Sequence, residues 1–198
     1  MKRHLVLSAI VFAISASTGV SALAQDAHTA FQRDWKQQSR IEQGLRNGRI
    51  TAGEAADLQQ QQGRINQLVA TALRDGRVSE DERARIDRAQ VEAGRDIRDA
   101  ERNRVRADPR SASSRRAAEQ AHQNLVQAQR IQAGLQDGSL THREAAQLQK
   151  GQARVSKIAH AAGRDGHISA QEQERIERAQ AVQDERIRRE RHDGQDRR

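Results

Sequence analysis

The sequence predicts an all-α protein, a tandem duplication of one three-helix antiparallel unit, arranged as a bundle or as an elongated, coiled-coil-like form. Three observations predict this fold. One segment repeats without a gap, a turn motif recurs within each repeat, and apolar residues between the turns follow helical spacing.

The internal repeat is visible when each residue is compared with the residue ninety positions later. Arg40–Gln90 then aligns with Arg130–Gln180, and roughly half of the aligned positions are identical. Shared composition alone does not give this many matches in one register. The chain therefore divides into a first helical repeat, 25–107, and a second, 108–192, followed by a disordered tail, 193–198.

Residues 1–24 have the organisation of a cleavable secretory signal peptide. Lys2 and Arg3 form a basic start, residues 5–14 are largely apolar, and Ala22–Ala24 has the A-x-A pattern of a cleavage site. The alternative is an uncleaved membrane anchor, but a spanning helix needs about 20 apolar residues and this run is shorter. We expect cleavage after Ala24, a periplasmic or secreted protein, and no membrane span after cleavage.

Composition limits the partners that the chain can recognise. Cleavage removes two basic residues and no acidic ones, so the net charge falls from +8 to +6, and the remaining charges of both signs are interleaved as on solvated helix faces. The chain has no cysteine, and Phe31 and Trp35 are the only aromatic residues left after cleavage. Nucleic acid is not favoured as a partner, because these two aromatic rings lie far in sequence from the Arg-rich stretches 95–106 and 186–191.

The turn motif reads Asp/Asn-Gly-x-Ile/Val/Leu-Ser/Thr-x-x-Glu. Its glycine can adopt the left-handed conformation that ends a helix, and its Ser or Thr can cap the next helix with the Glu as capping-box partner. The expected helix ends are Gly48, Gly76, Gly138 and Gly166, and the expected helix starts are Thr51, Ser79, Thr141 and Ser169.

Apolar residues between the turns step by threes and fours. The second helix of each repeat keeps this spacing only if a glutamine, Gln62 or Gln152, belongs to the apolar stripe. The third helices become increasingly charged toward their ends, so we expect them to fray or to project into solvent. The first helix is expected to bury Phe31, Trp35, Ile41 and Leu45.

The junction between the repeats contains the one proline of the chain. Asp108 followed by Pro109 suits a helix N-cap with proline at the first helical position, which predicts a break between the third and fourth helices. The alternative is one long helix with a kink at Pro109.

The turn motif resembles the second half of an EF-hand calcium loop. Two copies carry the candidate metal ligands, but the first loop position, where calcium needs a carboxylate, falls on Thr71 in one and on Ala161 in the other. Helix capping explains the same residues without an ion, so the sequence predicts neither a bound metal nor a cofactor. The candidate ligands are Asp75, Ser79, Glu82, Asp165, Ser169 and Glu172.

Catalysis is not expected. The carboxylates are spread along charged faces, and the glycines do not form a phosphate-binding loop. His142 lies at the start of one predicted helix, and His167 lies just after its end. At about 1.5 Å per residue the two are roughly 37 Å apart, so they cannot share a zinc ion. We therefore expect a non-enzymatic protein.

The segments Ile50–Glu54 and Leu140–Glu144, on basic helices after a signal peptide, resemble the Leu-Thr-x-x-Gln segments of the Spy and CpxP type of periplasmic proteins. Glu54 and Glu144 depart from that pattern. This resemblance implies a stress-related, chaperone-like or adaptor protein with protein clients. The chain also resembles uncharacterised secreted Gln/Arg/Ala-rich helical repeat proteins of proteobacteria, which imply no particular activity. Self-association as a homodimer stays open, because thin apolar stripes are often buried against a second copy. Calcium binding is the alternative function.

Overall fold

The computed structural model describes residues 18–76 and 78–193, and this part of the chain forms six helices and no strand. The prediction of an all-α fold is confirmed. Residues 1–17 of the predicted signal peptide lie outside the described residues, and residues 18–24 form the start of the first helix. The helices are α1 (Thr18–Arg46), α2 (Ala52–Leu73), α3 (Glu80–Arg102), α4 (Ala112–Gln136), α5 (His142–Gly163) and α6 (Ala170–Asp193).

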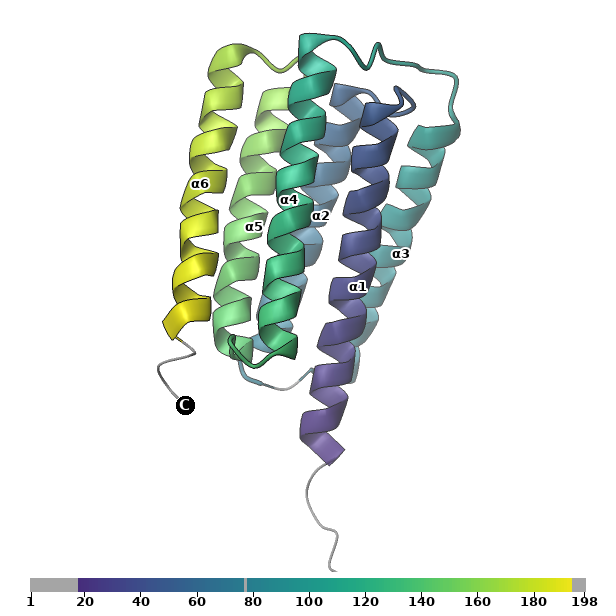
Figure 1. Ribbon diagram of the computed structural model, residues 1–198. Coiled ribbons are helices and arrows are strands. Elements are labelled where there is room, and N and C mark those ends of the chain that lie inside the picture. The colour runs from purple at the N-terminus through teal and green to yellow at the C-terminus, as the bar shows by residue number, and fades with distance from the viewer. Residues whose placement is uncertain (1–17, 77, 194–198) are drawn as a thin grey trace, which may run out of the picture.

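The six helices run side by side in one bundle (Figure 1). α2 packs most extensively against α5, and α1 packs against α4, so the middle of the bundle contains helices from both repeats. α3 contacts α1 and α2 at one edge, and α6 contacts α4 and α5 at the other. None of the described helices combines the length and the apolar composition that a membrane crossing needs.

The turn motif ends and starts helices as the sequence predicts. Gly48, Gly76, Gly138 and Gly166 all have φ between 73° and 83°, the left-handed region that glycine tolerates without strain. Complete capping boxes start α2, α3 and α5 at Thr51, Ser79 and Thr141. At the start of α6, Glu172 N donates to Ser169 Oγ while Ser169 N donates to the Glu172 carboxylate.

The chain breaks between α3 and α4 as predicted, but the prediction that Asp108 is the N-cap of α4 is wrong. Asp108 accepts a hydrogen bond from the backbone of Arg110, and the backbone of Ser111 donates to the Asp108 carbonyl, so these residues form a turn rather than the first turn of α4. Ser111 is the N-cap instead, because its hydroxyl accepts from the backbone of Ser114. Ala107 N donates to Gly48 O, which attaches the linker to the α1–α2 turn.

The expectation that α3 and α6 fray toward their ends is wrong, because both stay helical to Arg102 and Asp193. α3 buries a stripe from Ile86 to Ala100 and α6 a stripe from Ile176 to Ile187, whereas residues 188–193 of α6 are exposed or half-buried. α6 continues through Asp193, which was predicted to begin the disordered tail, while residues 194–198 lie outside the described part of the chain.

Both apolar clusters draw on both repeats. One brings Ile65 and Val69 of α2 together with Leu148 of α5, and the other contains Leu58 of α2 and Ala162 of α5. α2 and α5 approach closely because small residues face each other. A Cβ added to Gly63 would lie 2.9 Å from the Cβ of Ser156, a distance too short for two carbon atoms.

The substitution Gly63→Val tests this close approach. The branched side chain of valine has no room against Ser156. We therefore expect a loss of about 1–3 kcal/mol in the free energy of unfolding, measured by urea denaturation. Gly94→Ala in α3 is the control, because the added Cβ makes only ordinary van der Waals contacts, at 3.4 Å with Gln37 Nε2 and at 3.8 Å with the Arg98 guanidinium. This control should be neutral or stabilise by up to about 1 kcal/mol. An unchanged stability of Gly63→Val would show that α2 and α5 are not in close contact.

Candidate functional site

The candidate ligands of the first turn are used by the helix cap. The carboxylate of Glu82 accepts from Ser79 N at 3.0 Å and from Ser79 Oγ at 2.8 Å. Ser79 Oγ in turn accepts from Glu82 N, which completes the capping box. Both side chains therefore already have partners at the start of α3.

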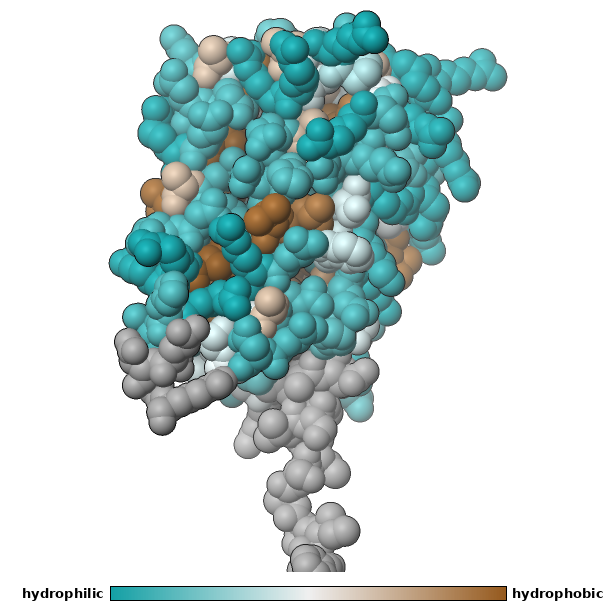
Figure 2. Space-filling model, viewed as in Figure 1, coloured by the Kyte–Doolittle hydropathy of each residue, from teal (hydrophilic) through white to brown (hydrophobic). Residues whose placement is uncertain are grey.

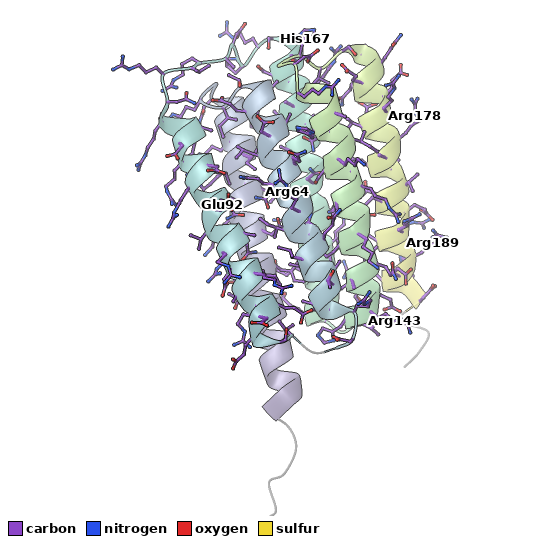
Figure 3. The ribbon with its side chains drawn as sticks, turned by 180° about the vertical axis from the view of Figure 1, so that it is seen from behind. Arg64, Glu92, Arg143, His167, Arg178 and Arg189 are labelled. Carbon is purple, nitrogen blue, oxygen red and sulfur yellow. The ribbon has the colours of Figure 1, made fainter. Side chains whose placement is uncertain are left out.

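The second turn, at the opposite end of the bundle, has the same arrangement. The Glu172 carboxylate accepts from Ser169 N and Oγ, and Asp165 accepts from His167 N at 2.9 Å. The hydrogen bonds from Ser169 lower the pKa of Glu172, and the negative charge of Asp165 opposes that shift. Within the described residues, no three His, Asp or Glu side chains gather as a metal-ligand set. His167 and Arg143, the neighbour of His142, lie at opposite ends of α5 (Figure 3).

Buried side-chain amides connect the helices, and only part of this set could be expected from the sequence. In the first repeat, Gln37 Nε2 donates to the main-chain carbonyl of Gln90 at 2.6 Å, and Gln90 Nε2 donates to Ala30 O at 2.8 Å. All three residues are buried. These two bonds hold α3 against α1. The glutamines at helical spacing in the apolar stripes were the one signal in the sequence.

The same pair of bonds occurs ninety residues later. Gln127 Nε2 donates to Gln180 O at 3.1 Å, and Gln180 Nε2 donates to Gln120 O at 3.2 Å, which holds α6 against α4. Buried amides therefore attach each outer helix in the same way. A hydrogen bond to a main-chain carbonyl needs close distance and alignment, so it fixes the rotation and the height of the outer helix.

A second chain of amides crosses between the repeats. Asn124 Nδ2 of α4 donates to Gln59 Oε1 of α2 at 2.9 Å, and Gln59 Nε2 donates onward to Gln38 Oε1 of α1 at 3.0 Å. Gln62 Nε2 also reaches Gln37 Oε1 at 3.0 Å. The interior of the bundle is thus joined by directional bonds as well as by apolar contact.

Asp34 is the one ionisable side chain among the buried polar residues of the described chain. It is 5% exposed, and its Oδ1 atom has no hydrogen-bond partner. Burial away from water raises the pKa of this carboxyl from 3.8 to about 7. A group of this kind is a candidate for function, because proteins rarely bury an unpaired carboxylate.

The surface between α1 and α4 carries an open groove of about 390 Å³. Its walls present side-chain amides, one ammonium group and the half-buried ring of Trp35, whose Nε1 atom is buried and has no hydrogen-bond partner. The face of the bundle seen in Figure 2 is mostly hydrophilic, with small and separate apolar patches. The groove is lined by Gln32, Trp35 and Lys36 of α1 and by Gln129, Gln132 and Gln136 of α4.

At Gln136, one of the groove residues, the two helices contact each other, since Gln136 Nε2 of α4 lies 2.9 Å from His28 Nδ1 of α1. Further along the seam, His122 Nδ1 of α4 lies 3.1 Å from the Glu42 carboxylate of α1. Where α1 and α4 meet, side-chain amides therefore lie along one half of the contact, and charged groups lie along the other half.

Comparison with protein-family models, curated proteins and solved structures finds no match to this chain. A proposal about function therefore depends on the chemistry of these side chains.

The substitution Ser169→Ala distinguishes a helix cap from a calcium site. Loss of the cap should lower the free energy of unfolding by about 1 kcal/mol, by the same amount with and without calcium, in thermal melts of the protein. Glu172→Gln is the matched control, because glutamine also serves in a capping box but is a weaker calcium ligand. A calcium-dependent rise in Tm that Glu172→Gln abolishes would make the turn a metal site.

Proposed function

We propose that the protein is an exported, non-enzymatic binding protein of the chaperone-like or adaptor kind, which holds segments of client polypeptides in the groove between α1 and α4. The observation that carries this proposal is the lining of the groove, in which four glutamine amides surround Trp35 and Lys36.

The chemistry of the lining suits a polypeptide main chain. Each peptide unit offers one N–H donor and one C=O acceptor, and a glutamine side chain carries the same two kinds of group. Gln32, Gln129 and Gln132 can therefore exchange hydrogen bonds with an extended segment whatever its side chains are. The indole of Trp35 adds apolar contact area, and Lys36 adds a positive charge. Such a groove favours broad recognition over a single sequence.

The proposal also includes export of the protein. Residues 1–24 have the pattern of a signal peptide, which predicts a mature protein in the periplasm or outside the cell. Ala30 is the first residue of α1 that is described as buried, so cleavage after Ala24 removes none of the described core. N-terminal sequencing of the exported protein should therefore begin at Gln25 and give a chain that stays folded.

Client binding is tested with the mature chain and an aggregating model protein. We expect suppression of light scattering at near-stoichiometric ratios, and a photo-crosslinking residue at Gln132 should capture the client. The same crosslinking residue at Arg178, which points outward from α6 (Figure 3), should not capture it. Absence of suppression together with absence of crosslinks at Gln132 would contradict the proposal.

The contribution of the groove is tested by Trp35→Ala. Removal of the indole should reduce suppression several-fold, because the largest apolar contact with the client is lost. Leu125→Ala is the matched control, since Leu125 occupies the aligned position in α4, is also half-buried, and is not among the residues that line the groove. Gln129→Glu provides a second variant at an exposed position, where folding should be unaffected. Equal activity of Trp35→Ala and Leu125→Ala would place client binding elsewhere.

A further inference from the structure

Arginine is concentrated at one end of the bundle, around the linker between α3 and α4. Residues 102–116 contain six arginines and one aspartate. The linker runs across the end of the bundle at which the α1–α2 and α5–α6 turns also lie (Figure 1). The three connections at this end carry five arginines and two aspartates, whereas the two connections at the opposite end carry two of each. We call residues 47–51, 102–116 and 164–169 the basic end.

Hydrogen bonds attach the linker segment to both neighbouring turns. Ala107 N donates to Gly48 O of the α1–α2 turn at 3.0 Å. At the start of α4, Ser113 Oγ accepts from Ile168 N of the α5–α6 turn at 2.8 Å. Arg116 Nη1 also donates to Ile168 O at 2.8 Å. The three segments are therefore joined, and their arginines belong to one surface.

Most guanidinium groups of the basic end are available to a partner. Six are exposed, and none of these six side chains forms a hydrogen bond or an ion pair with another residue of the described chain. The two aspartates accept main-chain hydrogen bonds within their own turns, Asp108 from Arg110 N and Asp165 from His167 N. The six exposed arginines are Arg49, Arg102, Arg104, Arg110, Arg115 and Arg164.

The carboxylates of the adjoining helix turns already have partners. Glu101, near the end of α3, pairs with Arg40 of α1. Glu54 and Glu172 accept hydrogen bonds from the N-cap residues of α2 and α6. The exposed arginines are therefore free to meet anionic groups of another molecule.

Val105 adds an apolar group to this surface. Its side chain is 54% exposed, and it stands in the linker between Arg104 and Arg106. Arg106 Nη1 donates to Val105 O, so this arginine is held against the linker. An exposed apolar side chain between basic residues suits the boundary between lipid headgroups and acyl chains, because phosphate attracts the arginines and hydrocarbon accommodates the apolar group.

We propose that the basic end binds the protein to a membrane surface rich in anionic phospholipid, with its arginines on lipid phosphates and Val105 at the headgroup boundary. Nucleic acid fits this surface less well, because the aromatic rings of the described residues, Phe31 and Trp35, lie outside the basic end. The residues that line the groove between α1 and α4 also lie outside it. Membrane binding is therefore independent of the proposed client binding.

The test is flotation of the protein with lipid vesicles, using a chain that begins at Gln25 and so keeps every described core residue. We expect binding to vesicles that contain phosphatidylglycerol, no binding to phosphatidylcholine alone, and weaker binding as the salt concentration rises. A triple variant, Arg49→Gln, Arg104→Gln and Arg110→Gln, should lower the partition coefficient about a hundredfold, at about fivefold per arginine.

A second triple variant is the matched control. Arg74→Gln, Arg143→Gln and Arg189→Gln remove the same charge from exposed positions away from the basic end. Arg143 and Arg189 lie toward the end opposite His167 (Figure 3). This control should keep its affinity within about twofold. Equal losses in the two triple variants would overturn the proposal, since only the net charge would then matter. Binding to duplex DNA without binding to anionic vesicles would overturn it as well.

A fluorophore at position 105 gives a second readout. The chain has no cysteine, so Val105→Cys provides one attachment point for a dye that is sensitive to its surroundings. Its emission should shift to the blue on anionic vesicles, because the dye enters a less polar region. Val182→Cys in α6 is the matched control, since Val182 is 56% exposed, and its dye should not shift. No shift at position 105, or equal shifts at both positions, contradicts membrane binding through the basic end.

Discussion

Glycine, alanine and serine occupy the positions at which α2 faces α5, and the close approach of these two helices sets the spacing of the whole bundle. Gly63 lies against Ser156, and Gly163 lies against Ala56, so the two backbones meet without large side chains between them. α1 and α4 are then held side by side along one face, and only the two edges remain for α3 and α6. Each outer helix buries one narrow stripe and exposes charged residues elsewhere.

An alanine-rich interior offers little apolar area, so packing alone defines the arrangement of the helices only weakly. The hydrogen bonds of the buried amides constrain the arrangement of the helices further. Gln90 and Gln180 attach the outer helices through main-chain carbonyls, and Gln59 connects α4 to α1 through α2. A typical hydrogen bond adds only about 1 kcal/mol to stability, but a buried amide left without a partner costs more than that. The network therefore selects one arrangement of the helices more than it strengthens the fold.

The local features of this fold could be predicted from the sequence, because each is decided within a few residues. The four Gly-stop and Ser/Thr-start turns end α1, α2, α4 and α5 and start α2, α3, α5 and α6, and the spacing of Gly, Ser or Thr, and Glu in each turn indicates both events. The start of α4 was mispredicted because two caps compete there, and Ser111 rather than Asp108 bonds to the first turn. The packing of α2 against α5 was not foreseen, since helical spacing identifies a buried stripe but not the helix that covers it.

The interior amides show why the candidate sites were harder to predict than the helices. Gln62 and Gln152 stood at helical spacing among apolar residues, yet a glutamine at such a position is read equally well as a surface residue. Asp34 carried still less information, because a lone carboxyl between Phe31 and Gln37 is normally solvated. Its burial depends on α1 meeting helices from both repeats, which is a property of the assembled bundle. The aligned Asn124 becomes informative only once its bond to Gln59 is known.

Asp34 and Trp35 are neighbours on α1: the carboxyl of Asp34 lies in the interior, and the side chain of Trp35 lines the groove. A displacement of α1 that changes the width of the groove also changes the surroundings of the carboxyl. The two effects must be reciprocal. A client that binds one protonation state of Asp34 more tightly must shift the proton affinity of Asp34 by the same free energy. A client with equal affinity for both states shifts nothing. The groove and the buried carboxyl are therefore independent only if α1 keeps its position when a client binds.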